Sequence, residues 1–184
     1  MKPQQQGFSL IELLICIGIA SILITISLPS MGTLTNKQSI NSQVSEIHSG
    51  LQLTRSLAVT NSDVWTLCTL NVEFECVKQG GITLAVFRDD NENRKIDSDE
   101  PLRRHTSIKN LSVKLSASNR SYMRFKMNGS SKESGNFQVC ALNSEFDYGR
   151  QVIVFRSGRI RISQDNDGDG YDESSSGSIH CATN

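Results

Sequence analysis

Residues 7–12 read Gly-Phe-Ser-Leu-Ile-Glu and open an apolar run that continues to Leu28. The run from Phe8 to Leu28 has about the length that an α-helix needs to span a bilayer core. Glu12 is the only charged side chain within it. A carboxylate at membrane depth costs about 2.5–3.5 kcal/mol on insertion scales, so such a residue indicates a function and a partner that neutralises it.

A short polar leader precedes the apolar run. Residues 1–7 carry Lys2 as their only charge, whereas a secretory signal peptide places its cleavage site after its apolar stretch. The leader is therefore the segment that we expect to be removed. Lys2 also favours an orientation with the N-terminus in the cytoplasm and the rest of the chain outside it. The alternative interpretation is a plain single-pass anchor whose Glu12 is solvated by lipid headgroups.

The stretch over residues 7–12 resembles the class III signal of type IV pilins and of type II secretion pseudopilins. This resemblance implies that a prepilin peptidase cuts between Gly7 and Phe8 and that the new N-terminal residue, Phe8, is methylated. It also implies that Glu12 pairs with the terminal amine of a neighbouring pilin or pseudopilin during assembly. The expected protein is a single-pass protein of the inner membrane with a periplasmic globular domain, and a pilus or pseudopilus subunit after assembly.

The sequence suggests four segments. They are a leader over 1–7, a transmembrane helix and assembly segment over 8–28, an amphipathic continuation of the helix over 29–63, and an extracytoplasmic β-rich domain over 64–184 with an acidic tail. The length is enough for one domain with a core of its own.

The amphipathic segment follows Pro29 and Gly32, which are expected to kink or loosen the helix. Beyond them, apolar residues recur at three- and four-residue steps, which predicts a helix with one apolar stripe that ends near residues 60–63. The members of this stripe are Ile40, Val44, Ile47, Leu51, Leu57 and Ala58.

After residue 63 the apolar period changes to two, which is typical of β-strands. The predicted strands cover residues 65–67, 82–86, 111–115, 122–127, 137–141 and 152–162. One long helix followed by about six or seven antiparallel strands predicts an α+β fold of the type IV pilin kind. In this fold the sheet covers the apolar stripe of the helix.

The sequence contains five cysteines. Cys16 lies in the apolar run, and the remaining four are an even number, which suggests two disulfides in an oxidising compartment. Of the three possible connectivities we favour Cys68 with Cys76, which closes a local hairpin, and Cys140 with Cys181, which ties the C-terminal tail to the sheet. A zinc site is disfavoured because no Cys-x-x-Cys spacing occurs and the histidines are scattered.

The charges are balanced over the whole chain but unevenly distributed. Residues 101–163 hold twelve Lys and Arg against three Asp and Glu, a net charge of +9, whereas residues 164–184 hold five acidic side chains and no Lys or Arg. The domain is therefore electrically polarised, with a basic middle and an acidic tail.

Three internal segments, 55–59, 86–103 and 155–161, resemble the FimT and GspH group of minor pilins and pseudopilins. Within the last one, Gly158-Arg159-Ile160-Arg161 matches the Gly-Arg-x-Arg motif with which some FimT-like minor pilins bind DNA during natural transformation. The resemblance implies that this protein binds double-stranded DNA without sequence specificity.

The spacing of Arg159 and Arg161 predicts that both guanidiniums leave the same face of a strand and can contact a phosphate backbone. Arg156 is expected to join them. The alternative is a solvated strand face, or arginines that pair with the acidic tail. Other basic side chains are candidates for enlarging the patch: Arg103, Arg104, Lys109, Lys114, Arg124, Lys126 and Lys132.

Two acidic loops have spacings that resemble calcium loops. In the first, Asp89 to Glu100, Arg94 stands where the turn needs glycine, so we favour a polar hairpin loop whose side chains bond nearby backbone. The second loop has Asp165, Asp167, Asp169 and then a glycine, but no glutamate at the twelfth position. Glu173, at the ninth position of this loop, is the expected ligand in place of that glutamate. No cofactor is expected, with calcium at this second loop as the open alternative.

The sequence gives no support for an enzyme, because Gly-x-Ser-x-Gly, His-Glu-x-x-His and Walker-type phosphate loops are all absent. Three function classes remain. They are a structural minor subunit of a type IV pilus, a GspH-like pseudopilin of a type II secretion system without DNA binding, and a DNA receptor carried by a pilus. The Gly-Arg-x-Arg match favours the pilus.

Overall fold

Helix α1 spans Leu10–Asn61. The structure is a computed structural model that describes residues 9–98, 100–117, 119–142, 147–175 and 177–181, without the side chains of 24–31. The chain divides into two compact units, residues 1–36 and 37–184, with the boundary inside α1. The helix continues through Pro29 and Gly32, so the predicted loosening does not end it.

The first unit contains the apolar half of α1. Its large apolar side chains between Leu10 and Leu23 are exposed. Among the residues described, no helix is both long and apolar enough to cross a membrane. The expected span over 8–28 includes Phe8 and the side chains of 24–28, which are not among the parts of the chain that the structure describes.

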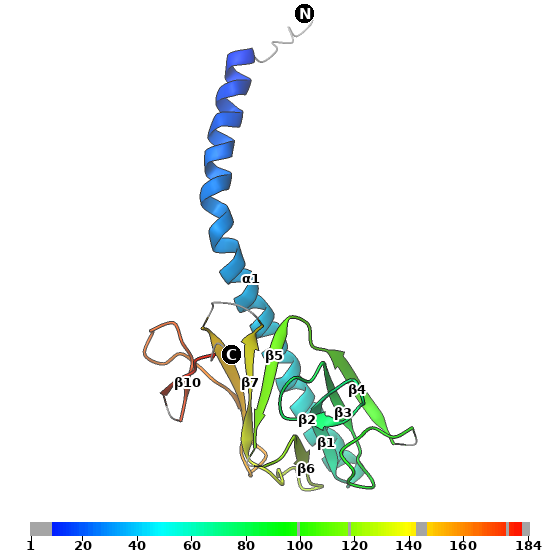
Figure 1. The fold of residues 1–184 in the computed structure, drawn as a ribbon. Coiled ribbons are helices and arrows are strands. Elements are labelled where there is room, and N and C mark those ends of the chain that lie inside the picture. The colour runs from blue at the N-terminus through cyan, green and yellow to red at the C-terminus, as the bar shows by residue number, and fades with distance from the viewer. Residues whose placement is uncertain (1–8, 99, 118, 143–146, 176, 182–184) are drawn as a thin grey trace, which may run out of the picture. The chain divides into compact units, whose positions relative to one another are not determined.

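The second unit begins with the amphipathic half of α1. Ile40, Val44, Ile47 and Leu51 are fully buried, as their three- and four-residue spacing predicts. The helix ends at Asn61, within the predicted range. Its stripe packs against strands of two antiparallel sheets in one hydrophobic cluster, and Figure 1 shows this part of α1 beside the strands.

In the described residues one sheet has the order β2-β1-β3-β4, with β6 also paired to β1, and the other has the order β5-β7-β8-β9. A small two-stranded sheet, β10-β11, lies in the tail. The strands are β1 (Trp65–Leu70), β2 (Cys76–Val77), β3 (Thr83–Phe87), β4 (Leu102–Ser107), β5 (Leu111–Ser116), β6 (Tyr122–Phe125), β7 (Gly135–Ala141), β8 (Gly149–Val154), β9 (Ile160–Ile162), β10 (Glu173–Ser174) and β11 (Gly177–Ser178).

This arrangement confirms the α+β fold and corrects two strand predictions. The expected strand over 152–162 is two strands, β8 and β9, because a tight turn interrupts it at residues 155–159. Strand β4 was not predicted, because its residues are mostly exposed and polar and give no apolar alternation. It pairs with β3 at the outer edge of the first sheet.

Both predicted disulfides are present. Cys68 is bonded to Cys76, and Cys140 is bonded to Cys181. The first links β1 to β2, and the second ties the tail to β7. The buried hydrophobic side chains of the described residues lie between Ile40 and Cys181, so the compact unit 37–184 contains this core and both bridges. A unit with its own core is expected to fold by itself.

Candidate functional site

The turn between β8 and β9 presents the Gly-Arg-x-Arg motif. The backbone N–H of Gly158 donates to the carbonyl oxygen of Phe155 at 2.8 Å, and the N–H of Phe155 donates to Arg159 at 2.9 Å. Gly158 has a φ of +83°, in the left-handed region that favours glycine. A Cβ at this position would lie 1.9 Å from the carbonyl oxygen of Gly129. The motif therefore needs glycine for both backbone conformation and space.

Two other elements hold this turn in place. The Arg55 guanidinium on α1 donates from Nη1 to the carbonyl oxygen of Gly158 at 3.1 Å. The N–H of Ser131 donates to the carbonyl oxygen of Arg156 at 3.1 Å. The turn is thus fixed from the helix on one side and from the segment that follows β6 on the other.

The arginines of the motif point outward. Arg156, Arg159 and Arg161 are exposed, whereas Ile160 and Ile162, which alternate with the last two arginines, are partly buried against the core. This alternation places Arg159 and Arg161 on one face, as predicted, although Arg159 lies one residue before β9. The guanidinium carbon of Arg159 lies 4.3 Å from the centre of the Phe155 ring, a cation–π contact that restrains it.

The described part of the acidic tail forms no ion pair with these arginines. Among the described residues, no ion pair joins Arg156, Arg159 or Arg161 to a carboxylate. The tail instead pairs with Arg150, whose Nε lies 2.8 Å from Asp172. Within the described residues, the alternative in which these arginines pair with the tail is therefore not found.

The other basic candidates separate into two groups. Three are engaged by acidic side chains: Arg104 pairs with Glu46, while Arg124 and Lys132 lie 3.2 and 3.8 Å from Glu92. Arg124 also pairs with the buried Glu133 at 3.0 Å. The remaining four are exposed, namely Arg103, Lys109, Lys114 and Lys126.

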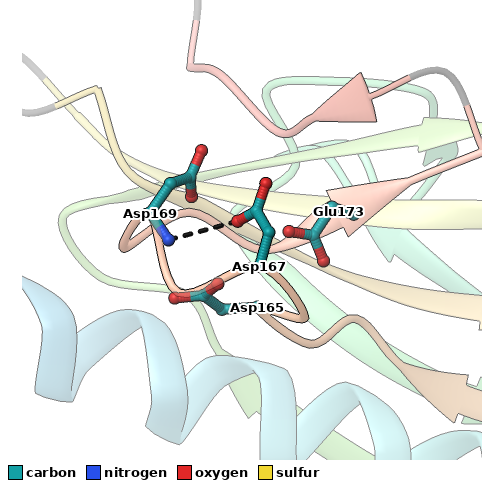
Figure 2. A group of neighbouring side chains, drawn as sticks. All are labelled: Asp165, Asp167, Asp169 and Glu173. Carbon is teal, nitrogen blue, oxygen red and sulfur yellow. Dashed lines mark hydrogen bonds between the residues drawn. The ribbon is translucent and has the colours of Figure 1, made fainter.

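The structure brings the four predicted calcium ligands together. Asp165, Asp167, Asp169 and Glu173 have carboxylate oxygens within 4.8 Å of one another, and Figure 2 shows the three aspartates on one loop with Glu173 facing Asp167 from β10. The N–H of Gly170, with a φ of +92°, donates to Asp165 at 3.0 Å. The loop geometry agrees with the sequence pattern, and calcium binding stays a prediction.

The first acidic loop is the polar hairpin loop that we favoured. Side-chain oxygens of Asp89, Asn91 and Asn93 accept backbone N–H groups within the loop at 2.7–3.1 Å. Glu100 is buried, and its Oε1 accepts the N–H of Asp90 at 2.9 Å. Burial raises the pKa of Asp89 and also the pKa of Glu100 because it disfavours the charged carboxylate.

The predicted assembly residues lie at the start of the chain. Gly7 and Phe8, with the expected cleavage between them, are outside the described residues. Glu12 is exposed in the first turn of α1, and its N–H donates to the hydroxyl oxygen of Ser9 at 3.2 Å. Ser9 therefore caps the helix, in the Ser-x-x-Glu arrangement of a capping box.

A groove that the sequence analysis did not predict lies beside the arginine turn. Its volume is about 580 Å³, and it lies between the last turns of α1 and the β8–β9 turn. Its lining consists of Gln52, Arg55, Ser56, Val59, Thr60, Ser157, Arg159 and Ile160. Arg55 belongs to segment 55–59, whose resemblance to the FimT and GspH group gives Arg55 no role of its own. No local pattern in the sequence connects Arg55 to Gly158 in the β8–β9 turn, 103 residues later.

Comparison with known protein families gives two matches. The family described as type II transport protein GspH matches residues 43–158, and the prokaryotic N-terminal methylation motif matches residues 2–28. Comparison with curated proteins gives no match.

The fold is similar to that of the type IV minor pilin FimU from Pseudomonas aeruginosa strain PAO1. The crystal structure in space group P21 has a TM-score of 0.54 and 24% identity, over 71% of this chain and 92% of that chain. The structure in space group P65 has a TM-score of 0.50 and 20% identity, over 67% of this chain and 92% of that chain. Because the GspH match covers more than half of the sequence, the chain belongs to the GspH family, and it combines a type IV pilin-like fold with a prokaryotic N-terminal methylation motif.

Proposed function

We propose that this protein is a minor type IV pilin that joins or primes a pilus and binds double-stranded DNA, without sequence specificity, for uptake in natural transformation. The observation that carries the proposal is the arginine turn. Arg156, Arg159 and Arg161 are exposed on a turn that Arg55 fixes, and none of the three forms an ion pair with a carboxylate of the described residues. Guanidiniums can contact phosphate oxygens in pairs of parallel hydrogen bonds.

The expected binding mode is electrostatic. A rigid turn with exposed arginines at a sheet edge can follow a phosphate backbone but offers no helix or ribbon to insert into the major groove, where bases are read. Affinity should therefore depend on salt and little on base sequence.

The proposal is tested by the affinity of residues 37–184 for a labelled DNA duplex. Replacing Arg159 and Arg161 together by Ala is expected to weaken binding at least about tenfold, because each lost phosphate contact also loses its share of counterion release. The matched control replaces Arg103 and Lys109 by Ala, which removes the same charge from exposed positions in and just after β4. Both were candidates for enlarging the patch, but β4 is the edge strand of the sheet that does not contain β9, so we do not expect them to join the arginine turn. Equal effects of the two double variants would refute a dedicated DNA surface.

Assembly through the first unit belongs to the same proposal. The exposed apolar side chains between Leu10 and Leu23 offer a surface that neighbouring pilins would cover. Glu12 would pair with a neighbour's terminal amine after a prepilin peptidase has cut before Phe8, with the protein held in the inner membrane until then. Replacing Glu12 by Ala should abolish incorporation into sheared pili while the cellular level stays normal. Normal incorporation of this variant would contradict the assembly role.

The second candidate is a GspH-like pseudopilin of a type II secretion system. The match of the GspH family over residues 43–158 favours it, and this candidate requires no DNA binding. Deletion of the gene separates the two functions. Loss of pili or of transformation supports the pilus, whereas loss of secreted enzymes with normal pili supports the pseudopilin.

A further inference from the structure

The groove beside the arginine turn has one wall from the helix and one from the turn. Gln52, Arg55, Ser56, Val59 and Thr60 follow one another at helical spacing and are all exposed. They are separate from the buried stripe of α1, so the fold does not need them for its core. Opposite them lie Ser157, Arg159 and Ile160 from the β8–β9 turn.

The groove is positively charged. Within the described residues its lining holds two arginines and no acidic side chain. The hydrogen bond from Arg55 to Gly158 uses one of the five N–H groups of its guanidinium. Arg159 is restrained by the Phe155 ring. Both cations are therefore held in place before a ligand arrives, which reduces the entropy that binding must overcome.

We propose that this groove holds one phosphodiester of the bound DNA strand together with its sugar, with Arg55 as a second cation opposite Arg159. The hydroxyls of Ser56, Thr60 and Ser157 can donate hydrogen bonds to phosphate oxygens. Val59 and Ile160 supply apolar contact for the deoxyribose ring. The inference rests on the proposed DNA binding and extends the contact surface from the β8–β9 turn to the helix.

The test places a negative charge in the groove. Ser56→Glu should raise the Kd of residues 37–184 for a labelled duplex at least about tenfold, because a carboxylate a few ångströms from the phosphate repels it and neutralises the arginines. Ser56→Gln has nearly the same size as Ser56→Glu without the charge, and both variants lose the hydroxyl. The Kd of Ser56→Glu should therefore exceed that of Ser56→Gln at least about fivefold. Gln52→Glu is an independent variant at a second lining position, and circular dichroism checks that each variant is folded.

The matched control adds the same charge elsewhere. Ser116 is exposed on β5, at the opposite edge of the sheet from β9, so Ser116→Glu should change the Kd by less than about threefold. If Ser56→Glu and Ser116→Glu act alike while the Arg159 and Arg161 variant still weakens binding, the groove inference is wrong and the proposed function stands.

Two further outcomes would overturn the inference. Absence of duplex binding by the wild type would remove both the proposed DNA function and the groove assignment. If inorganic phosphate at constant ionic strength saturates the groove and displaces no DNA, the groove is a site for free phosphate. If Ser56→Glu weakens the binding of heparin but not of DNA, the groove serves a sulfated polysaccharide instead.

Discussion

The Arg55 guanidinium on α1 donates a hydrogen bond of 3.1 Å to the carbonyl oxygen of Gly158, 103 residues later in the chain. This bond connects the end of the helix to the turn that carries Arg159. The N–H of Gly158 is already used within the turn. The position of the exposed arginines therefore depends on contacts made by the glycine of the motif, and not only on the arginines themselves.

Gly158→Ala should destabilise the domain by about 1–3 kcal/mol, because it combines a left-handed backbone with a clash against Gly129. The control is Gly168→Ala, because Gly168 has a similar φ of +81° and nothing within 4 Å of an added Cβ. Urea unfolding should show a larger loss in the free energy of unfolding for Gly158→Ala than for Gly168→Ala. Equal losses would mean that backbone conformation alone matters and that the contact with Gly129 does not.

The two disulfides should contribute unequally to stability. Their cysteines are 41 residues apart for Cys140–Cys181 and 8 apart for Cys68–Cys76. In the chain-entropy account, bridges that close loops of these lengths stabilise the folded state by about 4 and about 2.5 kcal/mol. Replacing each pair by Ser should therefore lower the free energy of unfolding more for the longer loop. The reverse order would show that the entropy of the unfolded chain does not decide the effect.

Asp89→Asn should stabilise the domain at neutral pH. Burial raises the pKa of Asp89 in the folded state, so the folded protein binds its proton more tightly than the unfolded chain. Stability from this group is therefore present below the unfolded pKa of about 3.9 and is lost as the pH rises through the folded value. The gain in Tm from the variant should be largest at pH 7 and shrink toward pH 3. A gain that is independent of pH, or one that Asp90→Asn also gives, would contradict this cause.

Calcium should raise the Tm of the domain if the second acidic loop binds it. The carboxylates of Asp165, Asp167, Asp169 and Glu173 repel one another at their observed separations, and a divalent ion would relieve that repulsion. The shift in Tm should appear at millimolar calcium, disappear with a chelator and be absent in Asp167→Ala. No shift and no heat of binding at millimolar calcium would remove the prediction.

The helix stripe, the sheet class and the Cys68–Cys76 bridge could be predicted because their signals are local. The Cys140–Cys181 bridge, whose cysteines are 41 residues apart, was the pairing left for the other two cysteines. Apolar residues at Ile40, Val44 and Ile47 show the helical period, and alternation shows most strands. Strand β4 was not predicted because it is a polar edge strand. Its position depends on pairing with β3 and not on an apolar pattern of its own. The turn inside 152–162 was overlooked although Ser157 and Gly158 mark it.

The candidate site was predictable only in part. The arginine motif and the acidic loop are short and continuous, so their spacing indicates their geometry. The groove brings together residues far apart in the chain, and the pairing of Asp172 with Arg150 is equally non-local. Such contacts depend on how the sheets pack against α1, which no local pattern contains.

The salt dependence of DNA binding tests the central claim most directly. The slope of log K against log salt counts the phosphate contacts, at about 0.9 per contact for duplex DNA. For residues 37–184 the Arg159→Ala and Arg161→Ala double variant should lower this slope by roughly 1.8 relative to the wild type. The Arg103→Ala and Lys109→Ala control should leave it nearly unchanged. An unchanged slope in the arginine-turn variant, or an equal decrease in the control, would contradict a DNA surface at this turn.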